Sequence, residues 1–265
     1  MKKLWGSCTA LLLFAVHVTA LPNALWAETL ASSLFDFRIY LYLKVKDEAA
    51  KALLPSGYSL APWSGGPFAG TNLMIVFVDQ YGRYDLQNKA LRDTGFLAAS
   101  IITWRRNEQA GVNWRIFGAH SFQSDDVVPT DRDRIVAKVR REMSCASDGI
   151  SYGGGSENWS VSVADDQQLE FTMTFDGRAP LFATQEARVT STTAPDGPRQ
   201  IRRNEVVSYL LPGPAAPESV VEGRDSLRDY RLISTIESLR PFLDGTEQLV
   251  SIRIIPTVTS RRFDP

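Results

Sequence analysis

The chain has 265 residues, of which 44% are hydrophobic and 22% are charged, and its formal net charge is −1. This composition is that of an ordinary globular protein, and the lack of a net basic balance argues against nucleic-acid binding. After residue 27 the chain contains one histidine, one cysteine and five lysines. Because most enzyme chemistry at neutral pH uses these residue types or a metal that they hold, their scarcity excludes many reactions.

The first 27 residues have the pattern of a cleaved export signal. Two lysines form a short positive region, and an apolar stretch runs from about Leu11 to Val18. This stretch is too short to span a bilayer as a helix, so we expect cleavage after Ala20 or, preferentially, after Ala27. We therefore predict an exported protein, periplasmic or extracellular, with no stable membrane insertion. Its single domain, residues 28–265, contains one cysteine and must be held together by its core rather than by a disulfide.

Most of the remaining chain is predicted to be strand, because short alternating or β-branched runs dominate it. The longest predicted strands are Phe35–Lys46, Asn72–Asp79, Gly95–Arg105, Asn113–Phe122 and Gln248–Arg261. The second of these is apolar on both faces, which indicates a buried strand at the centre of a sheet.

Two helices are expected between these strands. A brief helix over Asp47–Leu54 ends against Pro55. A longer helix begins at Thr130, with Asp133 three residues further on as the partner in a capping box, and runs to about Met143.

A flexible connector with three consecutive glycines is predicted over residues 151–156. It lacks the residues of a phosphate-binding loop and the spacing of a dinucleotide fingerprint, although a mobile loop of this kind could gate a pocket. A hairpin follows, comprising Trp159–Val163 and Leu169–Phe175 around a turn at Asp165-Asp166. With no internal repeat or convincing linker, the pattern predicts one mainly β domain with a few helices, of the α+β class.

No segment suggests a metal ion or another cofactor, and we expect none. One histidine and one cysteine cannot supply the ligands of a zinc site, and the acidic pairs lack the spacing of a calcium loop. A Ser-His-Asp triad would need His120, but no Gly-x-Ser-x-Gly elbow surrounds any serine. His120 is therefore expected either as a hydrogen-bonded structural residue or as a residue that lines a pocket.

Five motifs follow one another in the first part of the chain: Arg38 on a strand, Leu54-Pro55 after a short helix, the loop Ser64-Gly65-Gly66-Pro67, Asp79 at the end of an apolar strand, and Tyr84-Asp85. In this order they resemble the start of the acetoacetate decarboxylase-like family. The closing strand, residues 250–256, is similar in its residue pattern to the last strand of that family. The resemblance implies a β-rich cone or barrel that encloses a small-molecule cavity.

The resemblance breaks at the family's catalytic lysine. Family decarboxylases carry a Gly-Arg-Glu-like segment and then Pro-Lys-Lys, whose lysine forms a Schiff base once its pKa is lowered. Here Arg141-Glu142-Met143 is similar to the first part, but no lysine follows it anywhere in the chain. Lys138 precedes it and is expected to be solvated on the helix. We therefore expect no Schiff-base decarboxylation.

The leading functional prediction is an exported protein that binds a small organic acid or apolar metabolite in such a cavity. Arg38 would hold an anion through charge-assisted contacts, Asp85 and His120 would orient the ligand, and Tyr84 and Trp104 would supply apolar wall. Two alternatives stay open. One is a lyase or hydratase that uses Asp85 as base in the same cavity, and the other is a structural or partner-binding protein with an exposed apolar patch.

Overall fold

The computed structural model describes residues 29–264, except for residues 55, 86, 88, 91–94, 108–111, 125–133, 148–151, 177–180, 190–199 and 218–225. The described residues form thirteen β-strands, one α-helix and two short 3-10 helices. This confirms the prediction of a mainly β fold with few helices. The predicted export signal lies outside the described residues, and so does the start of the predicted long helix.

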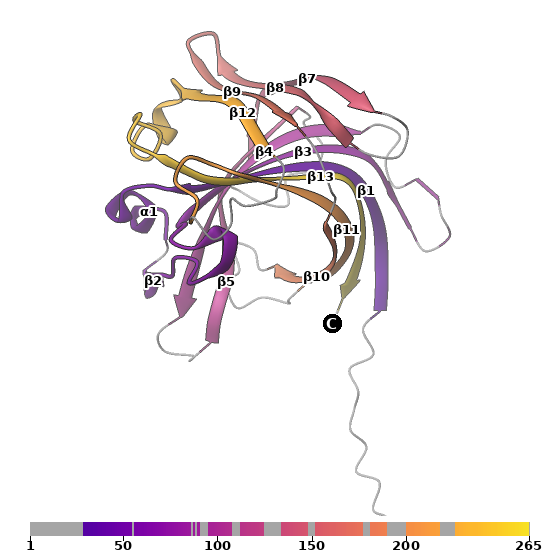
Figure 1. Cartoon of the computed structure of the whole chain (residues 1–265). Coiled ribbons are helices and arrows are strands. Elements are labelled where there is room, and N and C mark those ends of the chain that lie inside the picture. Colours follow the sequence, from indigo (N-terminus) through magenta and orange to yellow (C-terminus); the bar gives the residue numbers. More distant parts are fainter. Residues whose placement is uncertain are drawn as a thin grey trace, which may run out of the picture.

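Nine strands form the larger of two sheets. Their order is β10 (Leu181–Val189), β11 (Gln200–Pro212), β13 (Gln248–Asp264), β1 (Thr29–Lys44), β3 (Leu73–Tyr84), β4 (Phe96–Asn107), β5 (Val112–Gln123) and β6 (Arg134–Val136), with β2 (Tyr58–Leu60) paired to β4. All neighbours are antiparallel except β5 and β6. The sheet curls strongly, so that β10 approaches β5 from the far end of the strand order (Figure 1). In the described part no hydrogen-bonded ladder joins β10 to β5, so the curled sheet is not a closed barrel.

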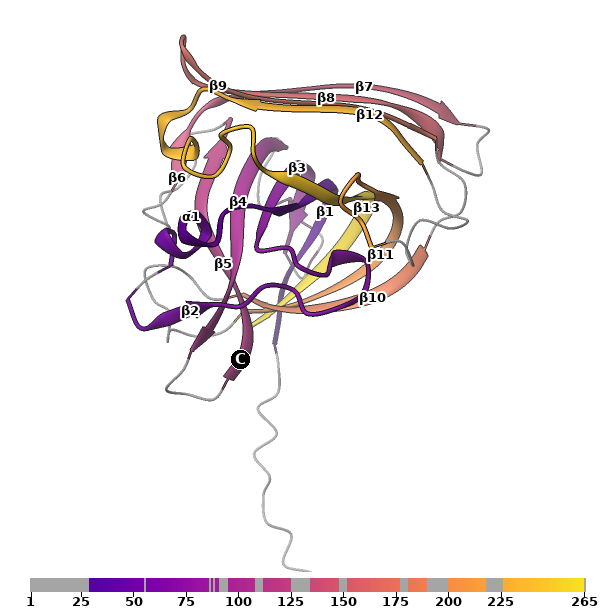
Figure 2. The same ribbon diagram turned by 60° about the vertical axis from the view of Figure 1, so that its left-hand side comes forward.

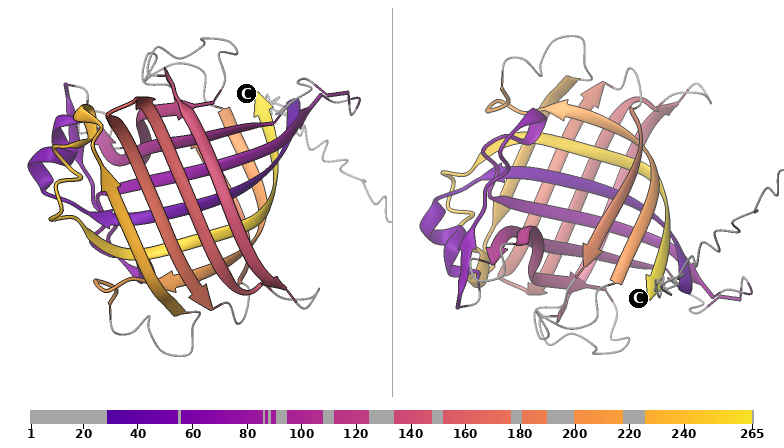
Figure 3. Two further views of the ribbon diagram at one scale, coloured as in Figure 1. Left: turned by 90° about the horizontal axis from the view of Figure 1, so that it is seen from above. Right: turned by 90° about the horizontal axis from the view of Figure 1, so that it is seen from below.

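Four antiparallel strands form the smaller sheet, in the order β12 (Ser226–Ser234), β9 (Gln167–Asp176), β8 (Tyr152–Ala164) and β7 (Lys138–Ser147). This sheet covers the convex side of the larger one (Figure 2), and the strands of the two sheets cross steeply (Figure 3). Phe77 of β3 stacks on Phe171 of β9 with ring centroids 5.4 Å apart and lies 5.2 Å from Trp159 of β8. The hydrophobic core therefore lies between the two sheets.

The predicted short helix is confirmed as α1 (Asp47–Ala52), which buries Ala50. It is held near the start of β3 by Asn72, whose side-chain amide bonds the backbone N–H and C=O of Val45 and the carboxylate of Asp47. The 3-10 helices η1 (Gly66–Phe68) and η2 (Glu237–Leu239) lie in connections between strands. No helix in the described part of the chain has the length and apolar character needed to cross a membrane.

The predicted helix from Thr130 to Met143 is wrong where the structure describes it, because β6 and β7 occupy residues 134–136 and 138–147. Ala137 and Val139 are buried, whereas Lys138 and Arg140 between and beside them are exposed. This burial has the period of two that belongs to a strand. Pairing with β8 and burial against the core outweigh the local capping signal.

The glycine-rich segment is also not a flexible connector, because β8 begins at Tyr152 and includes all three glycines. Gly154 is buried and has φ 128°, a backbone conformation that residues with a side chain rarely adopt. The glycines therefore serve the path of a paired strand. The hairpin that follows is confirmed, with β8 and β9 joined at Asp165-Asp166.

Candidate functional site

The alternating residues of β1 face two different environments. Phe37, Ile39 and Leu41 belong to the core between the sheets. Because successive side chains of a strand point to opposite faces, Asp36 and Arg38 point to the concave side of the larger sheet. The sequence folds in this way because every second residue from Phe37 to Leu43 is apolar. The candidate anion site is built on this concave face.

On the concave face, Arg38 binds Asp36 through two parallel hydrogen bonds. Nε of Arg38 donates to Oδ1 at 2.8 Å and Nη2 donates to Oδ2 at 2.6 Å, while Nη1 donates to the hydroxyl of Tyr40 at 3.2 Å. Asp36 is only 2% exposed. Burial alone would lower the pKa of Arg38, but Tyr40 and Asp36 outweigh burial and raise it. The guanidinium therefore remains charged in a mostly buried ion pair.

A second arginine, Arg253 of β13, lies beside this pair. Arg253 is paired in register with Tyr40 of β1, is 9% exposed, and donates a hydrogen bond to the Tyr42 hydroxyl. Burial and the nearby Tyr40 raise the pKa of Tyr42, and Arg253 opposes that rise. We refer to Asp36, Arg38, Tyr40, Tyr42 and Arg253 as the Arg38 cluster. Its charged side chains comprise two guanidinium groups and one carboxylate.

The loop around η1 covers one side of the Arg38 cluster. The ring of Phe68 stacks on Tyr42 at a centroid distance of 4.0 Å, and Trp63 contacts Phe68 edge-to-face at 5.6 Å. Met74 and Val76 of β3 complete this small apolar cluster. Among the described side chains, an aromatic wall therefore stands next to the charged groups, and the predicted Tyr84 is not part of it.

Two predicted site residues, Tyr84 and Asp85, do not join the Arg38 cluster. Tyr84 contacts Phe35 with ring centroids 5.7 Å apart, and strand alternation places Phe35 on the opposite face of β1 from Arg38. Oδ1 of Asp85 accepts hydrogen bonds from the backbone N–H groups of Gln87 and Lys89, each at 2.9 Å. Asp85 therefore closes a turn after β3.

The other two predicted site residues lie in paired strands. Trp104 of β4 is paired in register with Ile116, and His120 of β5 with Ile101. The side chains of both predicted residues lie outside the described part of the structure. Of the five predicted site residues, the structure thus places Arg38 in a buried polar cluster and places Tyr84 and Asp85 outside it.

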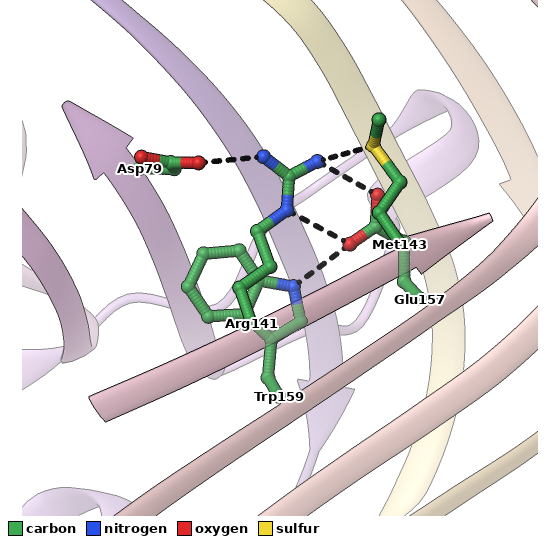
Figure 4. A network of polar contacts seen from close by, with 5 residues as sticks. All are labelled: Asp79, Arg141, Met143, Glu157 and Trp159. Carbon is green, nitrogen blue, oxygen red and sulfur yellow. Dashed lines mark hydrogen bonds and ion pairs between the residues drawn. The ribbon is translucent and has the colours of Figure 1, made fainter. Parts of the chain in front are cut away.

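A second polar network, centred on Arg141 of β7, was not predicted (Figure 4). Arg141 bonds both oxygens of Glu157, at 3.1 Å from Nε and 2.8 Å from Nη2, and Nη1 bonds Oδ2 of Asp79 at 2.8 Å. Nη2 also donates to the sulfur of Met143 at 2.9 Å, and Nε1 of Trp159 donates to Oε2 of Glu157 at 3.2 Å. Glu157 is completely buried.

The Arg141 guanidinium is held between aromatic rings as well as carboxylates. Its Cζ atom lies 3.6 Å from the ring centroid of Phe37 and 5.4 Å from that of Trp159. Burial alone would lower the pKa of Arg141, but its bonds to Glu157 and Asp79 outweigh burial and raise it. One sequence signal was the spacing of Glu157 and Trp159, which puts both side chains on one face of β8, and another was the motif Arg141-Glu142-Met143.

This second network borders a cleft of about 630 Å³ between the ends of the two sheets. The cleft is lined by Asp79, Tyr81, Phe96, Leu97, Arg141 and Met143, among other residues. A smaller cavity of about 300 Å³ lies against the edge strand β12, where it is bordered by Tyr230 and Glu247. Burial and the charge of Glu247 raise the pKa of Tyr230.

All five lysines after residue 28 lie at exposed positions: Lys44, Lys46, Lys51, Lys89 and Lys138. Lys46 forms an ion pair with Asp244 at 2.5 Å, and Lys138 is the first residue of β7. Within the described residues no group of three or more histidine, cysteine or acidic side chains is placed to hold a metal ion.

Comparison with known proteins finds similarity in structure only. No family model and no curated protein matches the sequence. Two structures of the enduracididine biosynthesis enzyme MppR superpose with a TM-score of 0.54 at 11% identity, one with HEPES bound and one with the condensation product of pyruvate and imidazole 4-carboxaldehyde. These matches cover 89% and 97% of this chain and 86% and 96% of those chains.

A third similar structure is an acetoacetate decarboxylase-like enzyme from Sphingomonas wittichii RW1. Its TM-score is 0.50 at 11% identity, and the match covers 88% of this chain and 91% of that chain. Because the three matches cover 88% to 97% of this chain, the similarity is not confined to one motif. The chain therefore has the acetoacetate decarboxylase-like fold.

Proposed function

We propose that the protein is exported and binds a small organic anion at the Arg38 cluster, without Schiff-base catalysis. The observation that carries this proposal is the placement of two mostly buried guanidinium groups, those of Arg38 and Arg253, beside tyrosine hydroxyls on the concave face. A bound carboxylate would find guanidinium and phenol donors already in place.

The positions of the lysines support the proposal that the protein does not use Schiff-base catalysis. A Schiff-base lysine needs a site that removes it from water and so lowers its pKa. Each of the five lysines after residue 28 is exposed, which does not meet this requirement. Reduction with borohydride in the presence of pyruvate should therefore leave the mass of the protein unchanged.

The alternative activity, a lyase or hydratase with Asp85 as base, has less support. The Asp85 carboxylate already accepts two backbone hydrogen bonds, which favours a structural role in its turn. Gln80 of β3 is paired with Asp36 of β1. Asp85 lies further along the chain, after the end of β3 and beyond an irregularity in the pairing of β1 with β3. Binding at the Arg38 cluster is therefore the function that the geometry favours.

A thermal-shift screen of the protein with small mono- and dicarboxylic acids tests the binding proposal. A ligand at one hundred times its Kd adds about 2.7 kcal/mol to the free energy of unfolding, or roughly 5 °C or more in Tm for a chain of this size. R253Q removes one of the two guanidinium groups and leaves the Arg38–Asp36 pair in place, and R38K removes the forked contact. Both should weaken binding roughly tenfold or more.

R140Q is the matched control, because Arg140 is an exposed arginine of β7 outside the cluster. It should bind the acid as the unmodified protein does. The proposal fails if no acid raises Tm, or if R253Q and R38K both bind the acid with unchanged affinity.

A further inference from the structure

The cleft beside Arg141 lies on the opposite face of the larger sheet from the Arg38 cluster. The Arg141 guanidinium packs on Phe37, whose side chain points away from its neighbour Arg38 by strand alternation. At about 630 Å³, the cleft falls within the size range of sites for small molecules. It is therefore a separate candidate site.

Arg141 lies in the cleft wall but has little capacity for an anion. A guanidinium presents five N–H donors. Four donor contacts go to Glu157, Asp79 and Met143, and the side chain of Tyr81 makes a further hydrogen bond. Because protein groups already engage these donors, a carboxylate ligand would have to break existing bonds.

Asp79, in contrast, has a carboxylate oxygen that can still accept a hydrogen bond. Its Oδ2 accepts from Arg141, and within the described residues no hydrogen-bond partner is found for its Oδ1. The side chain is 24% exposed and borders the cleft. The Arg141 guanidinium thus lies between two carboxylates, those of Asp79 and Glu157. Arg141 also holds the Asp79 carboxylate in a fixed orientation.

The remaining cleft wall suits the apolar body of a cation. Tyr81 is 55% exposed, Met143 is also exposed, and Phe96 is half-buried beside them. Aromatic faces attract ammonium groups, and a thioether adapts its shape to apolar groups. The wall thus combines aromatic and thioether surfaces with one open carboxylate oxygen.

We propose that this cleft binds a small organic cation, an ammonium group on an aromatic or aliphatic body. The ammonium group bonds Oδ1 of Asp79, and the carbon body packs against Tyr81, Phe96 and Met143. Arg141 and Glu157 act as the support that orients Asp79. This site is independent of the anion site proposed on the concave face.

Binding of 2-phenylethylammonium to the full chain, measured by calorimetry at pH 7, tests the proposal. We expect binding that weakens at least about tenfold in D79N, which removes the charge and keeps the shape. Y81A should weaken binding similarly, because it removes part of the aromatic wall. Since Tyr81 is exposed, Y81A should fold, and it tests the proposal even if D79N does not fold. D165N, which changes an exposed aspartate in the β8–β9 turn, should bind normally.

3-Phenylpropanoate, an anion of similar shape, is the matched probe. It should bind at least about tenfold more weakly than the amine at this cleft, and D79N should not abolish any binding that it retains at the Arg38 cluster. The proposal is overturned if the amine does not bind, if D79N and Y81A bind it normally, or if the acid binds as tightly and loses affinity in the same variants. Conversely, R253Q should leave amine binding unchanged, so the two proposed sites can fail separately.

Discussion

Asp36 is the residue on which the stability of the concave cluster depends most directly. It is the carboxylate partner of Arg38 and is almost completely buried. Removing one partner of a buried ion pair leaves the other charge uncompensated, which typically costs about 3 kcal/mol or more. We therefore expect D36N to lower the free energy of unfolding by about 3 kcal/mol, as measured by urea denaturation.

The double variant D36N/R38Q is the control for this prediction, because it removes both charges of the pair. Its cost should be at least about 1 kcal/mol smaller than the sum of the two single costs, as expected for residues in direct contact. If D36N cost less than about 1 kcal/mol, the carboxylate would not be compensating the arginines in the way the geometry indicates.

At the residue scale, the sequence predicted the residues that β1 contributes to this cluster but not the arginine that β13 contributes. Arg38, Asp36 and Tyr40 are separated by two positions on one strand, so period-two alternation alone puts them on one face. Arg253 comes from a strand more than two hundred residues later, and no local pattern pairs it with Tyr40. The Arg141 network was missed for the same reason, since Asp79 is 62 residues from Arg141. Such contacts depend on which distant strands pair and on how the two sheets pack.

At the scale of elements, the close approach of β3 and β4 depends on a glycine that borders the cleft. A Cβ atom at Gly95 would lie 2.2 Å from the backbone carbonyl oxygen of Gln80, and a backbone atom cannot move aside cheaply. Overpacking of this kind typically costs about 1–3 kcal/mol. G95A should therefore lower the free energy of unfolding by about 1–3 kcal/mol in a denaturation experiment.

Gly65 is the matched glycine for that experiment. It has extended backbone angles, φ −170° and ψ 177°, and a Cβ atom there would have no heavy atom within 4 Å. G65A should be neutral, or should stabilise slightly through the lower entropy of the unfolded chain. Equal costs for the two substitutions would contradict the close approach at Gly95.

The elements that sequence patterns predicted best are those whose period is unambiguous. Alternation located β1 and β13, and the turn at Asp165-Asp166 located the β8–β9 hairpin. The segment from Thr130 to about Met143 was predicted as helix because of a capping signal at its start, although Ala137 and Val139 already had the spacing of a strand. A short capping signal is weak evidence when the partner strand, here β8, is not yet known.

For the whole molecule, the curled sheet separates two chemically different environments. Its concave face holds the Arg38 cluster with two guanidinium groups, and its convex side holds the Arg141 network with two carboxylates around one guanidinium. Each face is reached by alternate residues of the same strands, as Asp36 and Phe37 illustrate. The two proposed binding sites therefore lie on opposite faces of one sheet.

The proposed export of the molecule makes a prediction about its mature terminus. β1 begins at Thr29 and is paired there with Asp264, so cleavage after Ala27 would leave the whole strand intact. In a Gram-negative host that expresses the full chain, we expect periplasmic protein whose intact mass lacks residues 1–27. L12R, which places a charge in the apolar stretch of the signal, should block both processing and export. Full-length protein confined to the cytoplasm in both cases would contradict the proposal.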